Sequence, residues 1–85
     1  MVIIESVYLR EYQLLLLLLR QARLEADLTQ QQVAERTGWE RTIVTKIETG
    51  DRRVDAIELR TYLKALGCDF ESFIRKLEVE IRRQQ

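Results

Sequence analysis

The side chains that could carry out chemistry in this 85-residue chain are few in kind. The chain contains no His and a single Cys, Cys68, which removes most metal sites and every mechanism that needs a His acid, base or nucleophile partner. The polar groups that remain bind other molecules through hydrogen bonds and charge. We therefore expect a binding protein rather than an enzyme, with no metal and no cofactor.

Polar residues that could bind gather on one face of a short helix predicted over residues 41–49. Val44 and Ile47 form the apolar stripe of this helix, which we expect to pack against Val33 of the preceding segment. The opposite face is either ordinary solvated surface or a binding surface. Its members are Arg41, Thr42, Thr45 and Lys46.

A second short helix must position this one. Thr29 is a typical N-cap residue, Gln32 three positions later completes a capping box, and the helix should run to about residue 36. Gly38 then permits a sharp turn into the next helix. Residues 29–49 together predict a helix-turn-helix, whose second helix enters the major groove of DNA. A plain helical hairpin shares most of these features, so the turn alone leaves both interpretations open.

The glycines divide the whole chain into five predicted helices, because Gly often ends a helix in a left-handed conformation. With no Pro and no room for a second core, the chain is expected to form one all-α domain over residues 1–85. The only strand-like pattern is a weak one at Val2–Ile4. In the fourth of the predicted helices, Ile57 is expected to belong to the apolar stripe that faces the core. The expected helices cover about 7–26, 29–36 and 41–49, then a segment capped by Asp55 and ending before Gly67, and a last segment capped by Asp69.

Charge and length limit the partners. Lys plus Arg and Asp plus Glu both number 14, so the net charge is zero, which is unusual for a nucleic-acid binder unless the charges are arranged one-sidedly. A lone Cys cannot form an internal disulfide, which favours a cytoplasmic location. The run Leu14–Leu19 is far shorter than the roughly 20 apolar residues that span a bilayer, and Met1–Leu9 lacks the basic start of a signal peptide. No association with a membrane is expected.

Residues 20–77 resemble the phage-repressor and Cro-like helix-turn-helix family, also called the XRE family. Three features depart from the family pattern: Asp27 replaces a usual Gly, Glu40 replaces a small capping residue, and residues 1–13 form an N-terminal extension with no counterpart in the minimal domain. The resemblance implies a five-helix, lambda-repressor-like DNA-binding domain, here with extended first and last helices. The segments that carry the likeness are Leu19–Arg23, Leu28–Gln30, Val33–Gly38, Val44–Gly50, Arg52–Asp55 and Ala65–Gly67.

The resemblance also implies roles for single residues. Arg41 is expected to read a guanine in bidentate fashion and Thr42 to contact a thymine methyl group or a phosphate. Arg23 and Glu48 are expected to form a partly buried ion pair that fixes the orientation of two helices. The expected base contacts are Arg41, Thr42, Thr45 and Lys46. The expected phosphate contacts are Thr29, Gln30, Arg52 and Arg53.

The leucine run predicts more apolar surface than one domain can bury. If Leu15, Leu16 and Leu19 face the core, then Leu14, Leu17 and Leu18 point elsewhere and would make an exposed patch of a kind that monomers rarely show. We therefore expect a homodimer. The residues predicted for its interface are Val2, Ile4, Leu14, Leu17 and Leu18.

These observations predict a sequence-specific DNA-binding transcriptional regulator, a repressor, that binds double-stranded DNA as a homodimer on a two-fold operator. The alternative is an antitoxin with a toxin as its partner, or another protein-interaction module with a helix-turn-helix fold. The zero net charge and the acidic residues Asp27, Glu40 and Asp51 favour the alternative. The cations Arg41, Lys46, Arg52 and Arg53 oppose it.

Overall fold

A computed structural model describes the backbone of residues 2–84 and the side chains of residues 8–84. This part of the chain forms five helices and no strand. The weak strand pattern at Val2–Ile4 is a wrong prediction, because α1 already begins at Val2: a helix satisfies its backbone groups internally, whereas a strand needs a partner. The helices are α1 (Val2–Glu25), α2 (Gln30–Thr37), α3 (Arg41–Thr49), α4 (Ala56–Leu66) and α5 (Phe70–Arg83).

Local capping chemistry sets the ends of the short helices. The Thr29 hydroxyl accepts a hydrogen bond from the backbone N–H of Gln32, and the Gln32 side chain accepts one from the backbone N–H of Thr29, which is the predicted capping box. Asp27 takes a φ of 59°, so it adopts the left-handed turn for which the family usually has Gly. Glu40 precedes α3 without any side-chain cap. The start of α3 therefore depends on packing more than on capping.

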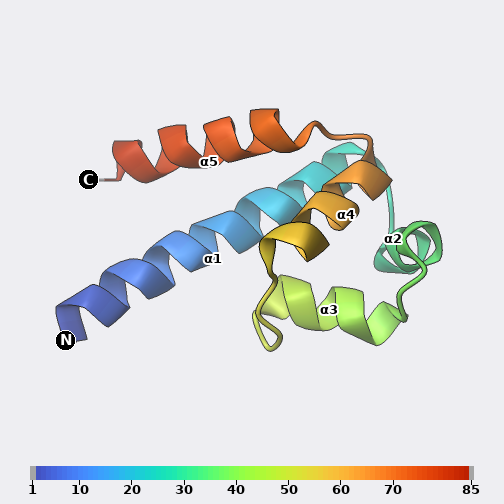
Figure 1. The fold of residues 1–85 in the computed structure, drawn as a ribbon, viewed down its shortest axis with the longest axis horizontal. Helices are drawn as coiled ribbons and strands as arrows, with labels where there is room; N and C mark the ends of the chain where they lie inside the picture. The colour runs from blue at the N-terminus through green and yellow to red at the C-terminus, as the bar shows by residue number, and fades with distance from the viewer. Residues whose placement is uncertain (1, 85) are drawn as a thin grey trace.

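Figure 1 shows α1 as the long axis of the molecule, with α2, α3 and α4 gathered around its C-terminal half and α5 returning along its other side. The predicted seam of the helix-turn-helix is confirmed, since Val33, Val44 and Ile47 are all completely buried. Ile57 is not part of the core as expected: it is 73% exposed. Leu59, Tyr62, Leu63 and Leu66 form the buried side of α4 instead.

The leucine run Leu14–Leu19 is buried within the chain to a greater extent than the sequence predicted. Leu14 and Leu18 are buried at 8% and 6% exposure, so the expectation that they point away from the core is wrong. They face α5, whose Phe73 is buried against the same core, and α5 therefore supplies the cover that the prediction assigned to a second subunit. Leu17 does point outward, with 53% exposure. The side chains of Val2 and Ile4, also predicted for the dimer interface, lie outside the described residues.

The leucine run of α1 raises the question of whether this helix could cross a membrane. Across residues 2–84, no helix is apolar over a sufficient length to cross a bilayer.

We predict that Leu18→Ala lowers the free energy of unfolding by about 2–5 kcal/mol, because it leaves a cavity between α1 and α5. Leu17→Ala, on the outer face of the same helix, should cost about 0.5 kcal/mol or less. Urea denaturation followed by circular dichroism measures both. Equal losses in the two variants would contradict the packing of α5 on the leucine run.

Candidate nucleic-acid interface

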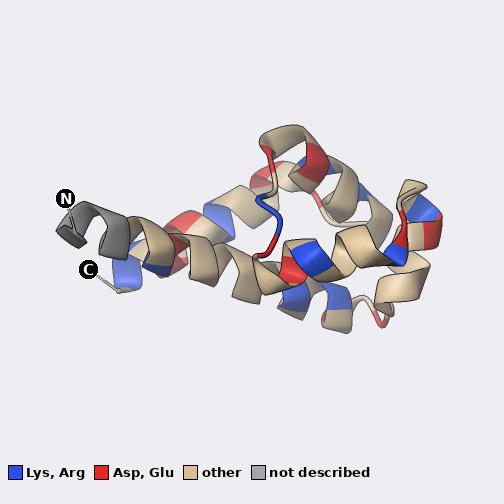
Figure 2. Ribbon diagram, turned by 90° about the horizontal axis from the view of Figure 1, so that it is seen from below, with Lys and Arg blue, Asp and Glu red and all other residues tan. Residues whose placement is uncertain are grey.

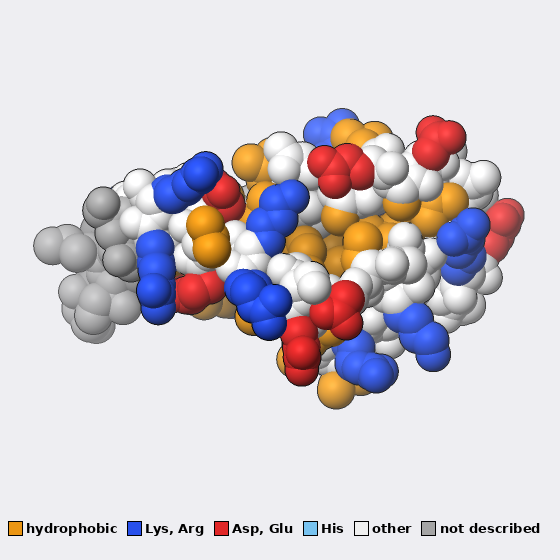
Figure 3. Space-filling model, turned by 90° about the horizontal axis from the view of Figure 1, so that it is seen from above, with side chains coloured by type: hydrophobic (Ala, Val, Ile, Leu, Met, Phe, Trp, Pro, Cys, Tyr) orange, Lys and Arg blue, Asp and Glu red, His pale blue; other side chains and the backbone are white. Residues whose placement is uncertain are grey.

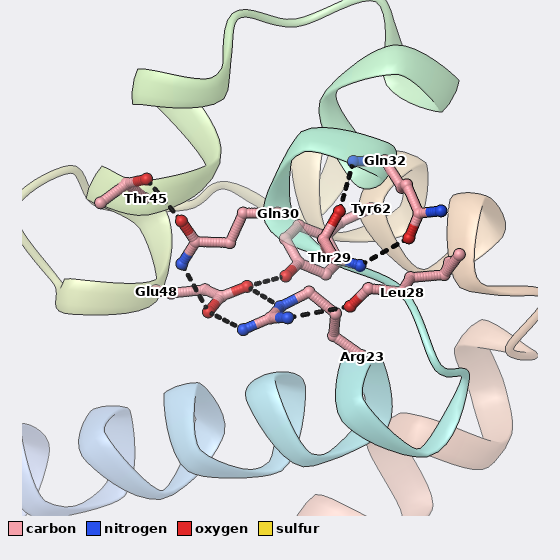
Figure 4. Close-up of polar contacts among 8 residues, drawn as sticks. All are labelled: Arg23, Leu28, Thr29, Gln30, Gln32, Thr45, Glu48 and Tyr62. Carbon is pink, nitrogen blue, oxygen red and sulfur yellow. Dashed lines mark hydrogen bonds and ion pairs between the residues drawn. The ribbon is translucent and has the colours of Figure 1, made fainter.

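The carboxylate of Glu48, at the end of α3, accepts hydrogen bonds from three other helices (Figure 4). Arg23 of α1 donates from Nε at 2.7 Å and from Nη2 at 3.1 Å, Gln30 of α2 donates from Nε2 at 3.1 Å, and the Tyr62 hydroxyl of α4 donates as well. The third nitrogen of Arg23 donates to the carbonyl oxygen of Leu28 at 2.9 Å. The expected pair of Arg23 and Glu48 is thus present. We call these four side chains, Arg23, Gln30, Glu48 and Tyr62, the Glu48 network.

The Glu48 network is almost sealed from water and yet charged. The side chains of Arg23 and Glu48 are only 9% and 4% exposed. Burial by itself would raise the pKa of Glu48, but the hydrogen bonds from Arg23, Tyr62 and Gln30 outweigh it, so the pKa lies below the usual range. Burial and the neighbouring Glu48 carboxylate raise the pKa of Tyr62, which keeps its hydroxyl protonated as a donor. Arg23, Glu48 and Tyr62 are thus held in the protonation states that the hydrogen bonds require.

The network extends to the predicted recognition helix through one further bond. The Thr45 hydroxyl of α3 donates to Oε1 of Gln30 at 2.7 Å, while the amide nitrogen of Gln30 donates to Glu48. Gln30, which was predicted to contact phosphate, therefore also braces α2 against α3. Thr45 is half-buried and keeps its oxygen lone pairs for accepting.

The other predicted base-reading side chains are open to solvent. Arg41, Thr42 and Lys46 are exposed on the outer face of α3, while Val44 and Ile47 on the opposite face are buried. Arg41 also lines a shallow hollow of about 510 Å³ that lies between the end of α1 and the starts of α2 and α3. Thr29 and Gln30 line the same hollow. The structure thus brings predicted base-contacting and phosphate-contacting residues together around one depression.

The two arginines of the loop between α3 and α4 make different contacts. Arg52 forms an ion pair with Glu58 of α4. The Arg53 guanidinium lies over two tyrosine rings of α1, with its central carbon 4.9 Å from the ring centre of Tyr8 and 5.2 Å from that of Tyr12. Sequence reasoning missed these partners. Its only available signal was the spacing of the two tyrosines, one helical turn apart on α1.

Charge on this side of the molecule is mixed. Figure 2, seen from below, looks onto α3 and the loop that follows it, and shows segments of both signs there. The acidic residues Glu40 and Asp51 are exposed beside the cations Arg41 and Lys46. The zero net charge is therefore not hiding a strongly one-sided basic face, and attraction to DNA through charge alone should be modest.

Comparison with known proteins decides the family. The family model for helix-turn-helix proteins matches residues 19–73, which is more than half of the chain. The chain belongs to the helix-turn-helix family, in its XRE type. It is a DNA-binding protein of the class that regulates transcription.

Solved structures agree with this assignment. An XRE-family-like protein from Pseudomonas syringae pv. tomato strain DC3000 is 36% identical, with 89% of this chain and 93% of that chain covered and a TM-score of 0.86. A mutant of the restriction-modification controller protein C.Esp1396I is 24% identical, with 88% of this chain and 97% of that chain covered and a TM-score of 0.80, and this likeness shows the fold alone. None of the curated protein sequences compared with the chain matches it.

The helix-turn-helix match covers the Glu48 network completely but leaves out part of the interface. Arg23, Gln30, Glu48 and Tyr62 all fall within residues 19–73. Tyr8 and Tyr12, which hold Arg53, lie before the matched region. The contacts that hold Arg53 therefore come from a part of α1 that the family model does not match.

We predict that Glu48→Gln lowers the free energy of unfolding at neutral pH by about 3–5 kcal/mol, because it leaves the buried Arg23 without a counter-charge. The pKa of Glu48 is lower in the folded chain, so its contribution is complete above the ordinary carboxyl value of 4.5 and is lost as the pH falls through the folded-state pKa. The stability of Glu48→Gln should accordingly change less with pH in the acidic range than that of the unaltered chain.

Urea denaturation between about pH 3 and 7 measures this, with Glu78→Gln as the matched control. Glu78 forms an exposed pair with Arg82, so its replacement should cost about 0.5 kcal/mol or less. A Glu48→Gln variant as stable as the control would contradict the structural role of the network.

Proposed function

We propose that the chain is a sequence-specific repressor that binds a two-fold DNA operator as a homodimer. The observation that carries the proposal is the exposed polar face of α3, Arg41, Thr42 and Lys46, on a helix fixed from within by the Glu48 network. Base reading needs side chains that reach outward from a helix of defined orientation. Repression is the mode we propose because it requires only that the operator be occupied.

We assign the contacts in two groups. Arg41, Thr42, Thr45 and Lys46 read base edges, since the residues in the N-terminal part of a recognition helix contact the bases. The start of α2 supports phosphate contacts, because its free backbone N–H groups and positive dipole end favour anions. The proposed phosphate contacts are Thr29, Gln30, Arg52 and Arg53.

We propose that the dimer surface lies on α5 and not on α1, where the sequence predicted it. Phe70 and Ile74 line a hollow of about 540 Å³ on α5, and Figure 3, which looks onto this side of the molecule, shows hydrophobic side chains gathered in a band. Glu71, Arg75 and Glu78 border the hollow, so two copies related by a two-fold axis can place acidic groups against basic ones. α5 lies on the far side of α1 from α3 (Figure 1), which leaves the recognition helix uncovered in such a dimer.

We predict that Arg41→Ala weakens binding to the preferred DNA by about 1–3 kcal/mol and relaxes the preference at one base pair. The preferred duplex is first selected from a random pool with the unaltered protein, and a scrambled duplex serves as comparison. Arg36→Ala is the matched control, because Arg36 is an exposed arginine near the end of α2 that donates to the carbonyl oxygen of Ala65. Equal binding of the unaltered protein to both duplexes, or failure to bind either, would favour an interaction module such as an antitoxin.

We predict that Ile74→Glu produces a folded monomer with weaker operator binding, because it places a charge in the proposed interface. Ile74 is 37% exposed, so the fold should tolerate the change. Leu17→Glu, on the outer face of α1, is the control and should remain dimeric. Sedimentation equilibrium at micromolar concentration measures both. A monomeric Leu17→Glu beside a dimeric Ile74→Glu would place the interface on α1.

A further inference from the structure

Arg53 is held by an aromatic surface on the N-terminal half of α1. Tyr8 and Tyr12 stack with their ring centres 6.2 Å apart and their planes at 14°. The Arg53 guanidinium lies within about the same short distance of both rings, 4.9 Å and 5.2 Å. Such distances are within the range of a favourable cation–π contact. The side chain of a surface loop is thereby fixed against a helix.

Tyr12 also holds the backbone of the loop. Its hydroxyl accepts a hydrogen bond from the backbone N–H of Val54 at 3.0 Å. Tyr12 therefore fixes the backbone next to Arg53, while Tyr8 and Tyr12 together fix the Arg53 guanidinium. The N-terminal part of α1 and the loop after the recognition helix form one unit, although 41 positions separate Tyr12 from Arg53 in the sequence.

The geometry of a guanidinium makes this arrangement useful for binding an anion. Its flat faces stack on aromatic rings, whereas its N–H donors point outward in the plane of the group. Stacking thus leaves the donors of Arg53 available for a phosphate while it restricts the rotamers of a side chain that is otherwise flexible. Arg52 differs, because its Nη2 donates to the carboxylate of Glu58 and only its other N–H groups remain for a phosphate.

We propose that Tyr8 and Tyr12 are positioning residues for a DNA phosphate contact made by Arg53. The proposal rests on the proposed function, since it needs the chain to bind DNA through this face. The tyrosines raise affinity by holding the arginine ready, and they do not read bases. The N-terminal part of α1, which precedes residues 19–73 matched by the family model, therefore sets the strength of DNA binding and not its sequence preference.

A double-mutant cycle between Tyr8 and Arg53 tests the proposal. The probes are a duplex selected from a random pool by the unaltered protein and a scrambled duplex, each titrated at several salt concentrations. Tyr8→Ala should weaken binding to both duplexes by about two- to five-fold, the usual size of an exposed cation–π contact. Tyr8→Phe should bind as the unaltered protein does, because the ring face is kept. In an Arg53→Ala background, which lowers the salt slope by about one, Tyr8→Ala should have no further effect.

Leu9→Ala is the matched control, because Leu9 adjoins Tyr8 and is 53% exposed. It should leave affinity unchanged, and thermal melts should show that every variant is folded. If Tyr8→Ala weakens binding as much with Arg53→Ala as without it, the tyrosine does not act through the arginine and the inference is overturned while the proposed function stands. If the unaltered protein binds neither duplex, the proposed function and the inference fail together.

Discussion

A single buried carboxylate fixes the relative positions of four helices. Glu48 accepts hydrogen bonds from Arg23 of α1, Gln30 of α2 and Tyr62 of α4, while it belongs to α3 itself. A carboxylate so far from water is tolerated only when its lone pairs are all engaged and a counter-charge is close. The arrangement contributes less to the net free energy of folding than to the selection of one helix arrangement. If a helix slid or rotated, a buried charge would lose its partner.

The same network connects the fold to the surface that we propose for DNA binding. Gln30 donates to Glu48 and accepts from Thr45. The side-chain amide of Gln30 therefore links the buried carboxylate to a residue on the polar face of α3. Arg41 and Lys46 lie on that face and depend on the orientation of the helix alone. The loop after α3 is held separately, because Tyr8 and Tyr12 of α1 lie against the guanidinium of Arg53. The proposed base-reading face and the proposed phosphate contact of Arg53 are thus supported by separate contacts.

The parts of this structure that were predictable from the sequence are local. The limits of α3, the Thr29 capping box and the buried seam of Val33, Val44 and Ile47 follow from residue type and spacing within a few turns. The pairing of Arg23 with Glu48 was expected from the family resemblance.

The parts that were not predictable depend on how distant segments meet. Leu14 and Leu18 were placed on the outside because the periodicity of α1 does not reveal that α5 covers a second side of it. Ile57 was placed inside on its apolar side chain alone, whereas Tyr62 occupies the core of α4 together with Leu59, Leu63 and Leu66. The contact of Arg53 with the tyrosines joins positions more than 40 residues apart and has no local signature. In each case the missing information was the position of a partner.

The most direct test of this account is the titration of the Glu48 carboxyl group itself, followed by carbon-13 NMR of the labelled side chain in the folded protein. The account requires this carboxyl to remain ionised below the usual pKa of glutamate, because the donors from Arg23, Tyr62 and Gln30 outweigh the effect of burial. The predicted result is a midpoint clearly below the ordinary carboxyl value of 4.5. A midpoint at or above that value would mean that the donors do not converge on Glu48, and that something other than this carboxylate holds the recognition helix in place.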